Sequence, residues 1–283
     1  MATVARNGRT APRPGFAAWM LCQRELVRFF RQRNRVIGAV GQPIIFWLLF
    51  GVGLDQSFQL SETGRAAEQS FQQYYVPGTI ALIVLFTAIF TTISIIEDRQ
   101  EGFLQSVLVA PLPRWSMVAG KILGGTLIAL IQAVLFLLLV LAVERRFDVG
   151  QTVQLVAMLG AAAFGLTGLG FVLAWRMDST QGFHAVMSVL LFPMWLLSGA
   201  FFPLPLLSEA DSWLRVAMFW VMRANPLTYA VAGVRRLMSG AEVGDALHLP
   251  SLATCWIVTI GFGLLMFAMA TYMTRYRTKG DLR

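Results

Sequence analysis

The sequence has little charge, little cysteine and little histidine. Only 13% of its 283 residues are charged, whereas 57% are hydrophobic. Because a soluble domain carries about 25% charged residues, this composition indicates a protein whose solvent is lipid. Cys22 and Cys255 fall near opposite ends of the predicted spans, so we expect two free thiols. No spacing resembles a metal site, and we expect neither a metal nor a catalytic residue.

A phosphate-binding loop of the form Gly-x-x-x-x-Gly-Lys-Ser/Thr is also missing from the sequence. The chain therefore does not hydrolyse ATP by itself. No Asp or Glu falls within a predicted span, which argues against transport coupled to protons or sodium ions. The net charge of +8 sits at the ends of apolar runs rather than on one patch, which excludes nucleic acid as a partner.

Long apolar runs dominate the sequence. A bilayer core of about 30 Å needs about 20 apolar residues in helical form, and six segments meet this requirement. We therefore predict an all-α membrane protein with a cytoplasmic tail and interfacial helix at 1–35, a six-span domain at 36–274 and a cytoplasmic tail at 275–283. The predicted spans are 36–54, 76–96, 115–143, 151–175, 182–202 and 251–274.

Lysine and arginine set the expected orientation. With the N-terminus inside, 16 of them fall on the cytoplasmic side and 7 on the outer side. This bias predicts a multi-pass protein of the bacterial inner membrane with both termini in the cytoplasm.

Two apolar segments do not fit a span. Phe16 to Arg35 has a helical period, with arginines that we expect to face headgroups or a partner, and it predicts a helix lying in the cytoplasmic interface. The expected apolar side comprises Trp19, Cys22, Leu26, Phe29 and Phe30, and the expected basic side Arg24, Arg28, Arg31 and Arg35.

The second is the outer segment before the last span. Trp213 to Met222 and Ala224 to Met238 are interrupted by arginines, and Asn225-Pro226 breaks the helix between them. We expect short re-entrant or surface-lying helices here.

The most informative loop joins the second and third spans. Glu97, Asp98 and Glu101 are expected to pair with Arg99, and Lys121 to snorkel outward. A short amphipathic stretch from Phe103 to Val109 follows, and Pro111 ends it. Its exposed apolar face predicts a docking surface for a partner. The candidate docking residues are Glu97, Asp98, Arg99, Glu101, Gly102, Phe103, Leu104, Val107, Leu108, Pro111 and Arg114.

Gly120-x-x-x-Gly124 allows close helix approach, either within the chain or at a dimer seam. His184 and the few small polar residues of the spans are expected to be packing residues rather than a relay.

In three places the sequence resembles the permease subunits of type 2 ATP-binding-cassette (ABC) exporters, and drug-resistance and nodulation-factor permeases in particular. The first is the loop just described, from Glu97-Asp98-Arg99 to Arg114 and Lys121. The others are 24–54, with Gln42-Pro43 and Phe50 to Leu54, and 225–238, with Asn225 to Tyr229 and Arg235 to Met238.

The resemblance implies that Glu101 to Pro111 is a coupling helix, seated in a cleft of a separate ATPase that binds ATP and magnesium. It further implies two ATPases and two permeases, most simply a homodimer, with the pathway between the permeases. Asn225, Pro226 and Tyr229 would belong to an extracellular gate.

We therefore expect an exporter permease for a hydrophobic or amphipathic substrate such as a drug, lipid or glycolipid. One alternative is a membrane-embedded enzyme acting on lipid-linked substrates, which needs a carboxylate or histidine cluster facing a cavity. The other is a secondary transporter, which would be active in vesicles that lack ATP and an ATPase.

Overall fold

The computed structural model describes residues 13–32, 71–143, 148–201, 212–240, 244–245 and 247–275, together with positions 36, 37, 41 and 45. The first predicted span, 36–54, lies almost wholly outside these residues. So do most of the predicted tails. That span, the total of six spans and the side of the membrane on which each end lies remain predictions.

Every regular element of the described residues is a helix, which confirms the predicted all-α class. Among the described residues, five stretches are long and apolar enough to cross a membrane: Tyr75–Gln100, Arg114–Val140, Val149–Trp175, Thr180–Ala200 and Leu252–Met273. The helices are α1 (Pro14–Arg31), α3 (Phe71–Thr91), α4 (Ile93–Gln100), α5 (Phe103–Val109), α6 (Arg114–Val143), α7 (Val149–Trp175), α8 (Thr180–Trp195), the π-helical turn η2 (Leu196–Ala200), α9 (Trp213–Ala224), α10 (Pro226–Ser239) and α12 (Leu252–Met273).

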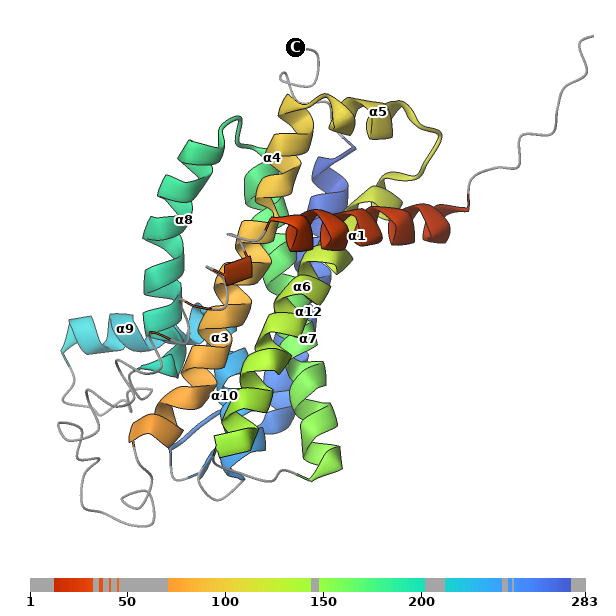
Figure 1. The fold of residues 1–283 in the computed structure, drawn as a ribbon. Coiled ribbons are helices and arrows are strands. Elements are labelled where there is room, and N and C mark those ends of the chain that lie inside the picture. The colour runs from red at the N-terminus through yellow and green to blue at the C-terminus, as the bar shows by residue number, and fades with distance from the viewer. Residues whose placement is uncertain are drawn as a thin grey trace, which may run out of the picture.

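The long helices run side by side and alternate in direction (Figure 1). α3, α6, α7 and α12 form the body, and α8 stands at its edge against α3 and η2. α1 lies across the bundle near the end that carries α5, and it packs mainly against α6. We call this the α5 end of the molecule.

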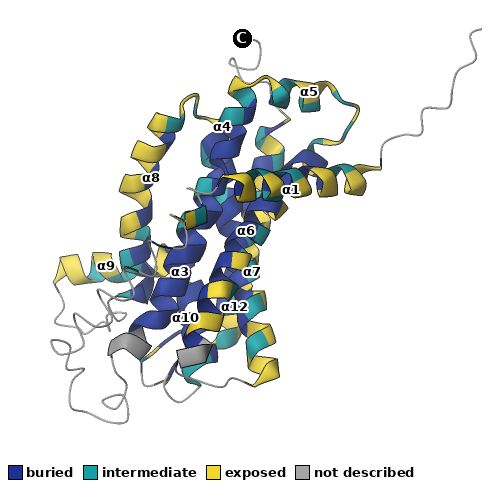
Figure 2. Cartoon of the chain, in the orientation of Figure 1, coloured by how far each residue is buried: buried dark blue, intermediate teal, exposed yellow. Residues whose placement is uncertain are grey.

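α3 and α4 form the centre of the bundle (Figure 2). From Tyr75 to Ile96, only Phe86 and Phe90 are not fully buried. The helix continues to Gln100, four residues beyond the predicted end of the second span, with only a turn at Thr92. The expectation that no acidic residue lies within a span stays a prediction, because Glu97 and Asp98 belong to the helical stretch Tyr75–Gln100 but follow the predicted end of the second span.

Glycines bring the helices close together. A Cβ on Gly165 would lie 2.7 Å from the Phe262 ring, and one on Gly168 would lie 2.8 Å from Met266, so α7 and α12 pack tightly. Gly120 and Gly124 pack within the chain, against α1. A Cβ on Gly120 would lie 2.6 Å from the carbonyl oxygen of Ala18.

The two sides of α1 differ from the prediction. Cys22 and Phe29 are buried, but Trp19 and Phe30 are about half exposed, so the predicted apolar side is split between two faces. The reason is that α6 packs against the side of α1 that carries Cys22, Glu25 and Phe29. This side is therefore buried, although Glu25 is charged.

The fifth predicted span breaks near its C-terminal end. α8 contains Pro193 and passes into η2, where Gly199 has a φ of 78°. Trp195 fixes this break, because its indole Nε1 donates to the carbonyl oxygen of Gly78, 2.8 Å away on α3.

The close approach at Gly120 gives a prediction with a matched control. Gly120→Ala should destabilise the protein by about 1–3 kcal/mol, because the new methyl group overlaps α1. Gly261→Ala should stabilise it by up to about 1 kcal/mol through helix propensity, since a Cβ there meets no atom within 4 Å. Thermal unfolding in one detergent compares them, and an equal shift in both variants would contradict the packing.

Candidate functional site at the α5 end of the bundle

The short helix α5 follows α4 after one tight turn. Gly102 has a φ of 78°, a conformation that costs glycine little and other residues more. α5 ends at Ala110, which is extended, and the Arg114 guanidinium donates to the carbonyl oxygen of Leu108 at 3.1 Å. This contact satisfies one of the free carbonyl groups at the end of the helix.

α5 rests on the bundle through one side. Leu104 is buried, with 3% of its surface exposed, and Phe103, Val107 and Leu108 are partly buried. Val109 is 86% exposed. The predicted exposed apolar stretch is thus mostly turned inward, because the bundle uses these side chains for packing.

The outward side of α5 is narrow and has little charge. Gly102, Ser106 and Val109 are exposed at positions i, i+4 and i+7, with Glu101 and Pro111 exposed at either end. Of the candidate docking residues, only Glu101, Gly102 and Pro111 are exposed, and Ser106 and Val109 were not among those candidates.

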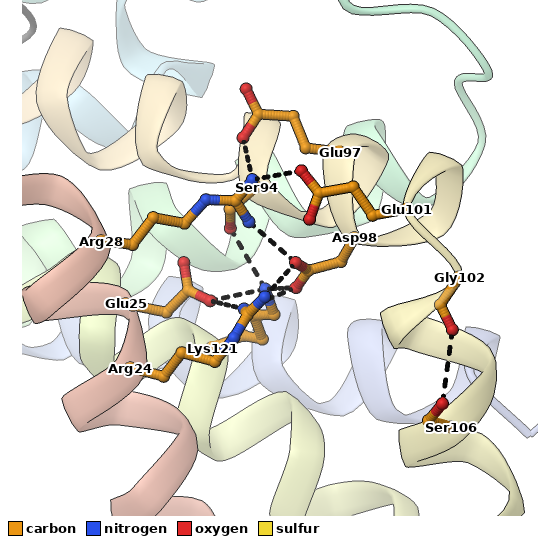
Figure 3. Close-up of polar contacts among 10 residues, drawn as sticks. All are labelled: Arg24, Glu25, Arg28, Ser94, Glu97, Asp98, Glu101, Gly102, Ser106 and Lys121. Carbon is orange, nitrogen blue, oxygen red and sulfur yellow. Dashed lines mark hydrogen bonds and ion pairs between the residues drawn. The ribbon is translucent and has the colours of Figure 1, made fainter. Parts of the chain in front are cut away.

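Beneath α5 lies a cluster of seven charged side chains from α1, α4, the residue that follows α4, and α6 (Figure 3). We call it the charge cluster. It comprises Arg24, Glu25, Arg28, Glu97, Asp98, Glu101 and Lys121.

Asp98 is the centre of the charge cluster, and its side chain is completely buried. The Arg24 guanidinium donates to both carboxylate oxygens, at 2.7 and 3.0 Å, and Arg28 donates to one of them at 2.8 Å. Lys121 donates to the other oxygen. One carboxylate of α4 therefore binds two cations of α1 and one of α6.

Lys121 joins a second buried carboxylate to this centre. Its ammonium donates to Glu25 at 2.6 Å and to the Ser94 hydroxyl at 3.2 Å, and only 4% of its side chain is exposed. The prediction that Lys121 snorkels outward is wrong. A lysine at this position could reach water, but two buried acids in reach hold it inside.

The rim of the charge cluster is more exposed. Arg28 pairs with Glu97 at 2.9 Å and with Glu101 at 3.2 Å, and the Glu101 side chain is 58% exposed. Contacts of this kind contribute about 0–1 kcal/mol each. The buried centre therefore contributes more to the stability of the fold than the rim does, because removing one member of a buried pair costs about 3–5 kcal/mol.

Arg99 does not join the charge cluster, so its predicted pairing with Glu97, Asp98 and Glu101 is wrong. It donates to the carbonyl oxygens of Trp175 at 2.8 Å and Met177 at 3.1 Å. Asp178 lies 3.5 Å away. Arg99 thus closes the end of α7, where a cation is favourable, and ties α4 to a fourth helix.

A cation–π contact joins α1 directly to α5. The Arg24 guanidinium carbon lies 3.8 Å from the centre of the Phe103 ring, well inside the range of such contacts. Phe103 therefore faces α1 and contributes to the attachment of α5 rather than to its outward side.

The predicted gate residues lie near the C-terminal end of α8, away from the α5 end of the bundle. Asn225 caps α10, since its side chain accepts from the amide of Leu227, and its Nδ2 donates to the carbonyl oxygen of Met194 at 2.6 Å. The Tyr229 hydroxyl donates to the carbonyl oxygen of Arg223, and Pro226 begins α10. These contacts join α8, α9 and α10, and the role of these residues in a gate stays a prediction.

The sequence does not predict that α1 and α6 supply the cations that bind Asp98. Arg24 and Arg28 were expected to face headgroups or a partner, whereas both turn toward Asp98 on α4 of the same chain. One signal was present: Glu25 lies beside Cys22 and Phe29 on the inward side of an amphipathic helix, and a buried charge requires a partner.

Comparison with known proteins adds an independent finding. Residues 17–239 match the family model described as ABC-2 type transporter. The putative transport permease ycf38 of Cyanophora paradoxa is 26% identical over 226 residues, 78% of this chain and 73% of that protein. The daunorubicin resistance ABC transporter permease protein DrrB1 of Streptomyces coeruleorubidus is 25% identical over 223 residues, 77% of this chain and 73% of that protein. The inner membrane transport permease YadH of Escherichia coli (strain K12) is 26% identical over 256 residues, covering 87% and 91% of the two chains.

Removal of the buried lysine should loosen α1. Lys121→Met leaves Glu25 with only the Arg24 contact at 3.3 Å and leaves Asp98 with fewer cations, so we expect a loss of about 3–5 kcal/mol of stability. Cys22, 1% exposed on the inward side of α1, should then react faster with a maleimide in a Cys255→Ser background. The control Asp178→Asn removes an exposed carboxylate and should change stability by about 0–1 kcal/mol. Unchanged melting and an unreactive Cys22 in Lys121→Met would show that the charge cluster does not hold α1.

The buried position of Cys22 predicts how the rate of alkylation of its thiol depends on pH. Burial raises the pKa of the Cys22 thiol above its ordinary value, and the nearby Glu25 carboxylate raises it further. A raised pKa lowers the thiolate fraction at any pH below it. The rate of alkylation of native Cys255→Ser protein should therefore rise at a higher pH than that of the same protein unfolded in SDS. Coincident pH profiles would contradict this environment.

Proposed function

Because this chain belongs to the ABC-2 type transporter family, we propose that it is the permease subunit of an exporter driven by a separate ATPase chain. Within such a transporter this chain is the membrane-spanning subunit, and the sequence contains no phosphate-binding loop of its own. In this proposal, α5 is the element that the ATPase binds.

The observation that carries the proposal is the combination of an exposed outer side of α5 with a firmly fixed inner side. Gly102, Ser106 and Val109 are free to meet a partner, while Leu104 and the Arg24–Phe103 contact hold the helix to the bundle. A docking element must have both properties, because a partner can move the bundle only through a rigid attachment.

The charge cluster supplies that attachment. When two ATPases close on ATP, a displacement of α5 passes along α4 to Asp98, and from there through Arg24 and Arg28 to α1 and through Lys121 to α6. Arg99 carries the same displacement to the end of α7. Four helices would therefore move as one body.

The assembly in this proposal has two permease copies and two ATPases, with ATP and magnesium bound by the ATPases. Both ends of the chain and α5 lie in the cytoplasm, and the bilayer is the inner membrane. The bias of 16 to 7 in lysine and arginine supports this orientation. In keeping with it, α12 runs toward the α5 end of the bundle (Figure 1).

The cargo in this proposal is hydrophobic or amphipathic. The rings of Phe86 and Phe90, the two incompletely buried positions in the C-terminal part of α3, lie 5.3 and 5.2 Å from the rings of Phe192 and His184 on α8. Aromatic rings in this position favour an apolar or aromatic molecule over a small ion. The relative DrrB1 is named for resistance to daunorubicin, which supports a drug as one candidate cargo.

The outer gate in this proposal consists of the break in α8 and the short helices α9 and α10, entering the membrane from outside. The Asn225 contact to Met194 supports it, because a broken helix at membrane depth needs its free carbonyl groups satisfied by protein.

A charge on the outward side of α5 should separate permease and ATPase. Val109→Asp should abolish co-purification with the phosphate-loop ATPase of the native cells, and transport with it, because an apolar docking contact cannot accommodate a buried carboxylate. Leu104 is unsuitable for this test, since it is buried and its substitution would disturb folding.

The matched control for Val109→Asp is Val149→Asp. Val149 is 77% exposed, lies at the opposite end of the bundle and begins α7, where an acidic residue is favourable. It should retain both complex and transport. An intact complex with Val109→Asp would reject α5 as the docking element, and transport in vesicles without any ATPase would reject the exporter itself.

A further inference from the structure

α8 is attached to the bundle along one narrow stripe. Of positions 181–193, only Phe183, Met187 and Leu191 are buried, and every other position is exposed (Figure 2). The three buried side chains recur every four residues, so they lie one above the other on a single side of the helix. A helix at the edge of a bundle that is held in this way has few contacts to oppose a tilt.

The C-terminal end of α8 is held much more firmly. Trp195 is only 3% exposed, and its indole Nε1 donates to the carbonyl oxygen of Gly78 on α3 at 2.8 Å. Its ring meets the rings of Tyr75 and Phe201 edge-on, with ring centres 6.1 and 6.3 Å away. We call these contacts the Trp195 anchor.

α10 holds the same end of α8 from another side. The Asn225 Nδ2 donates to the carbonyl oxygen of Met194 at 2.6 Å. α10 itself packs tightly on the body, because a Cβ on Gly233 would lie 2.8 Å from Met158 on α7 and 3.2 Å from Cys255 on α12. The end of α8 is thus fixed to α3 directly and to α7 and α12 through α10.

A weak point in α8 lies beside this fixed end. Pro193 has no N–H group, so it cannot make the helical hydrogen bond to the carbonyl oxygen of Val189. The helix then widens into the π-helical turn η2. Prolines and π-helical turns are the positions at which helices bend most readily, and here they adjoin the Trp195 anchor.

The N-terminal end of α8 follows the end of α4. The Gln100 side chain donates to the carbonyl oxygen of Asp178 at 3.0 Å, and the next residue, Ser179, caps α8 by accepting from the Gly182 amide at 3.1 Å. α4 is separated from α3 by a turn at Thr92. A tilt of α4 at this turn would therefore move the start of α8 relative to α3.

We propose that α8 is a lever that pivots at Pro193, with the Trp195 anchor as its fixed point. Tilting moves the start of α8 away from α3 and leaves its C-terminal end in place. The contact between Phe90 and His184 lies toward the moving end and would part first. Trp195 is then a positioning residue, because it determines which end of α8 moves.

The consequence for cargo rests on the proposed function. In an exporter, the parting of Phe90 and His184 would open the space between α3 and α8 at the α5 end, where a planar aromatic molecule could enter between the rings. The lever itself is a property of this chain alone, and it can be measured whether or not an ATPase binds.

The first test measures how motion varies along α8. Single spin labels are placed at Gln181→Cys, Ala185→Cys or Val189→Cys, three exposed positions spaced four residues apart, each paired with a label at the exposed Ile257→Cys on α12. The background is Cys22→Ala/Cys255→Ala, and labelled chain is diluted with unlabelled chain in nanodiscs.

The lever predicts a gradient of motion. The three positions lie about 21, 15 and 9 Å along the helix from Trp195, at 1.5 Å per residue. In the permease alone, the distance distribution should therefore be broadest for 181 and narrowest for 189. In the complex with the ATPase, trapping ATP should shift the distance for 181 about twice as far as that for 189.

Three results would overturn the lever. Equal shifts at 181, 185 and 189 would show that α8 moves as a rigid rod. The largest shift at 189 would place the pivot at the other end. Equal, narrow distributions in both nucleotide states would show a fixed helix. If no ATPase binds, the proposed function fails, but the widths in the permease alone still decide whether α8 is a lever.

The second test removes the hydrogen bond of the Trp195 anchor. Trp195→Phe keeps a ring beside Tyr75 and Phe201 but has no N–H to donate. The matched control is Trp175→Phe. Trp175 is as deeply buried, and its indole Nε1 has no hydrogen-bond partner within the described part of the chain. In the permease alone, Trp195→Phe should broaden the distribution at 189 to match that at 181, and Trp175→Phe should preserve the gradient.

The same variants separate positioning from general damage. In the complex, Trp195→Phe should lower transport several-fold while ATP hydrolysis continues, because α8 then moves without a fixed point. Asn225→Asp provides a second variant, since it keeps the oxygen that caps α10 and loses the donor to Met194. It should likewise broaden the distribution at 189. A preserved gradient in both Trp195→Phe and Asn225→Asp would show that these contacts do not fix the pivot.

Discussion

The buried carboxylate of Asp98 is the constraint on which the α5 end of this protein depends. A charge without any exposed surface is stable only when cations and donors surround it, and here they come from two other helices: Arg24 and Arg28 from α1, and Lys121 from α6. The need of the buried Asp98 carboxylate for cations thus fixes where α1 crosses the bundle. The glycines of α6 make that crossing possible, because Gly120 and Gly124 leave room for the backbone of α1. Charge and close packing therefore act together, and neither would position α1 alone.

This arrangement attaches α5 firmly to several other helices. A seven-residue helix has too little surface to be stable by itself, yet α5 is tied to α1 through Phe103, to the bundle through Leu104 and to α6 through Arg114. Arg99 adds the end of α7. A partner that grips the exposed side of α5 would therefore act on several helices at once.

Much of the fold could be predicted from the sequence, because apolar length and helical period are local properties. α6, α7 and α12 lie close to their predicted positions, and α9 and α10 separate at the Asn225-Pro226 break as expected. The partners of charged residues could not be predicted in the same way. Asp98 and Arg99 are adjacent in sequence but point to different helices, and Lys121 turns inward because of acids 23 and 96 residues away. Such pairings depend on which helices pack together, which neither composition nor spacing specifies. Glu25 on the inward side of α1 was the one local sign of them.

The central claim is that the charge cluster makes α1 and α5 one rigid body during transport. The most direct measurement is the distance between spin labels at Arg31→Cys on α1, an exposed position, and Gln105→Cys on α5, a partly exposed position that is not one of the proposed docking residues. The labels are placed in a background without Cys22 and Cys255, and the distance is measured in the complete permease–ATPase complex in nanodiscs. We expect the same narrow distance distribution in the nucleotide-free and ATP-trapped complexes. A distribution that shifts or broadens when ATP is trapped would show that α5 moves independently of α1 and that the charge cluster does not couple the two helices.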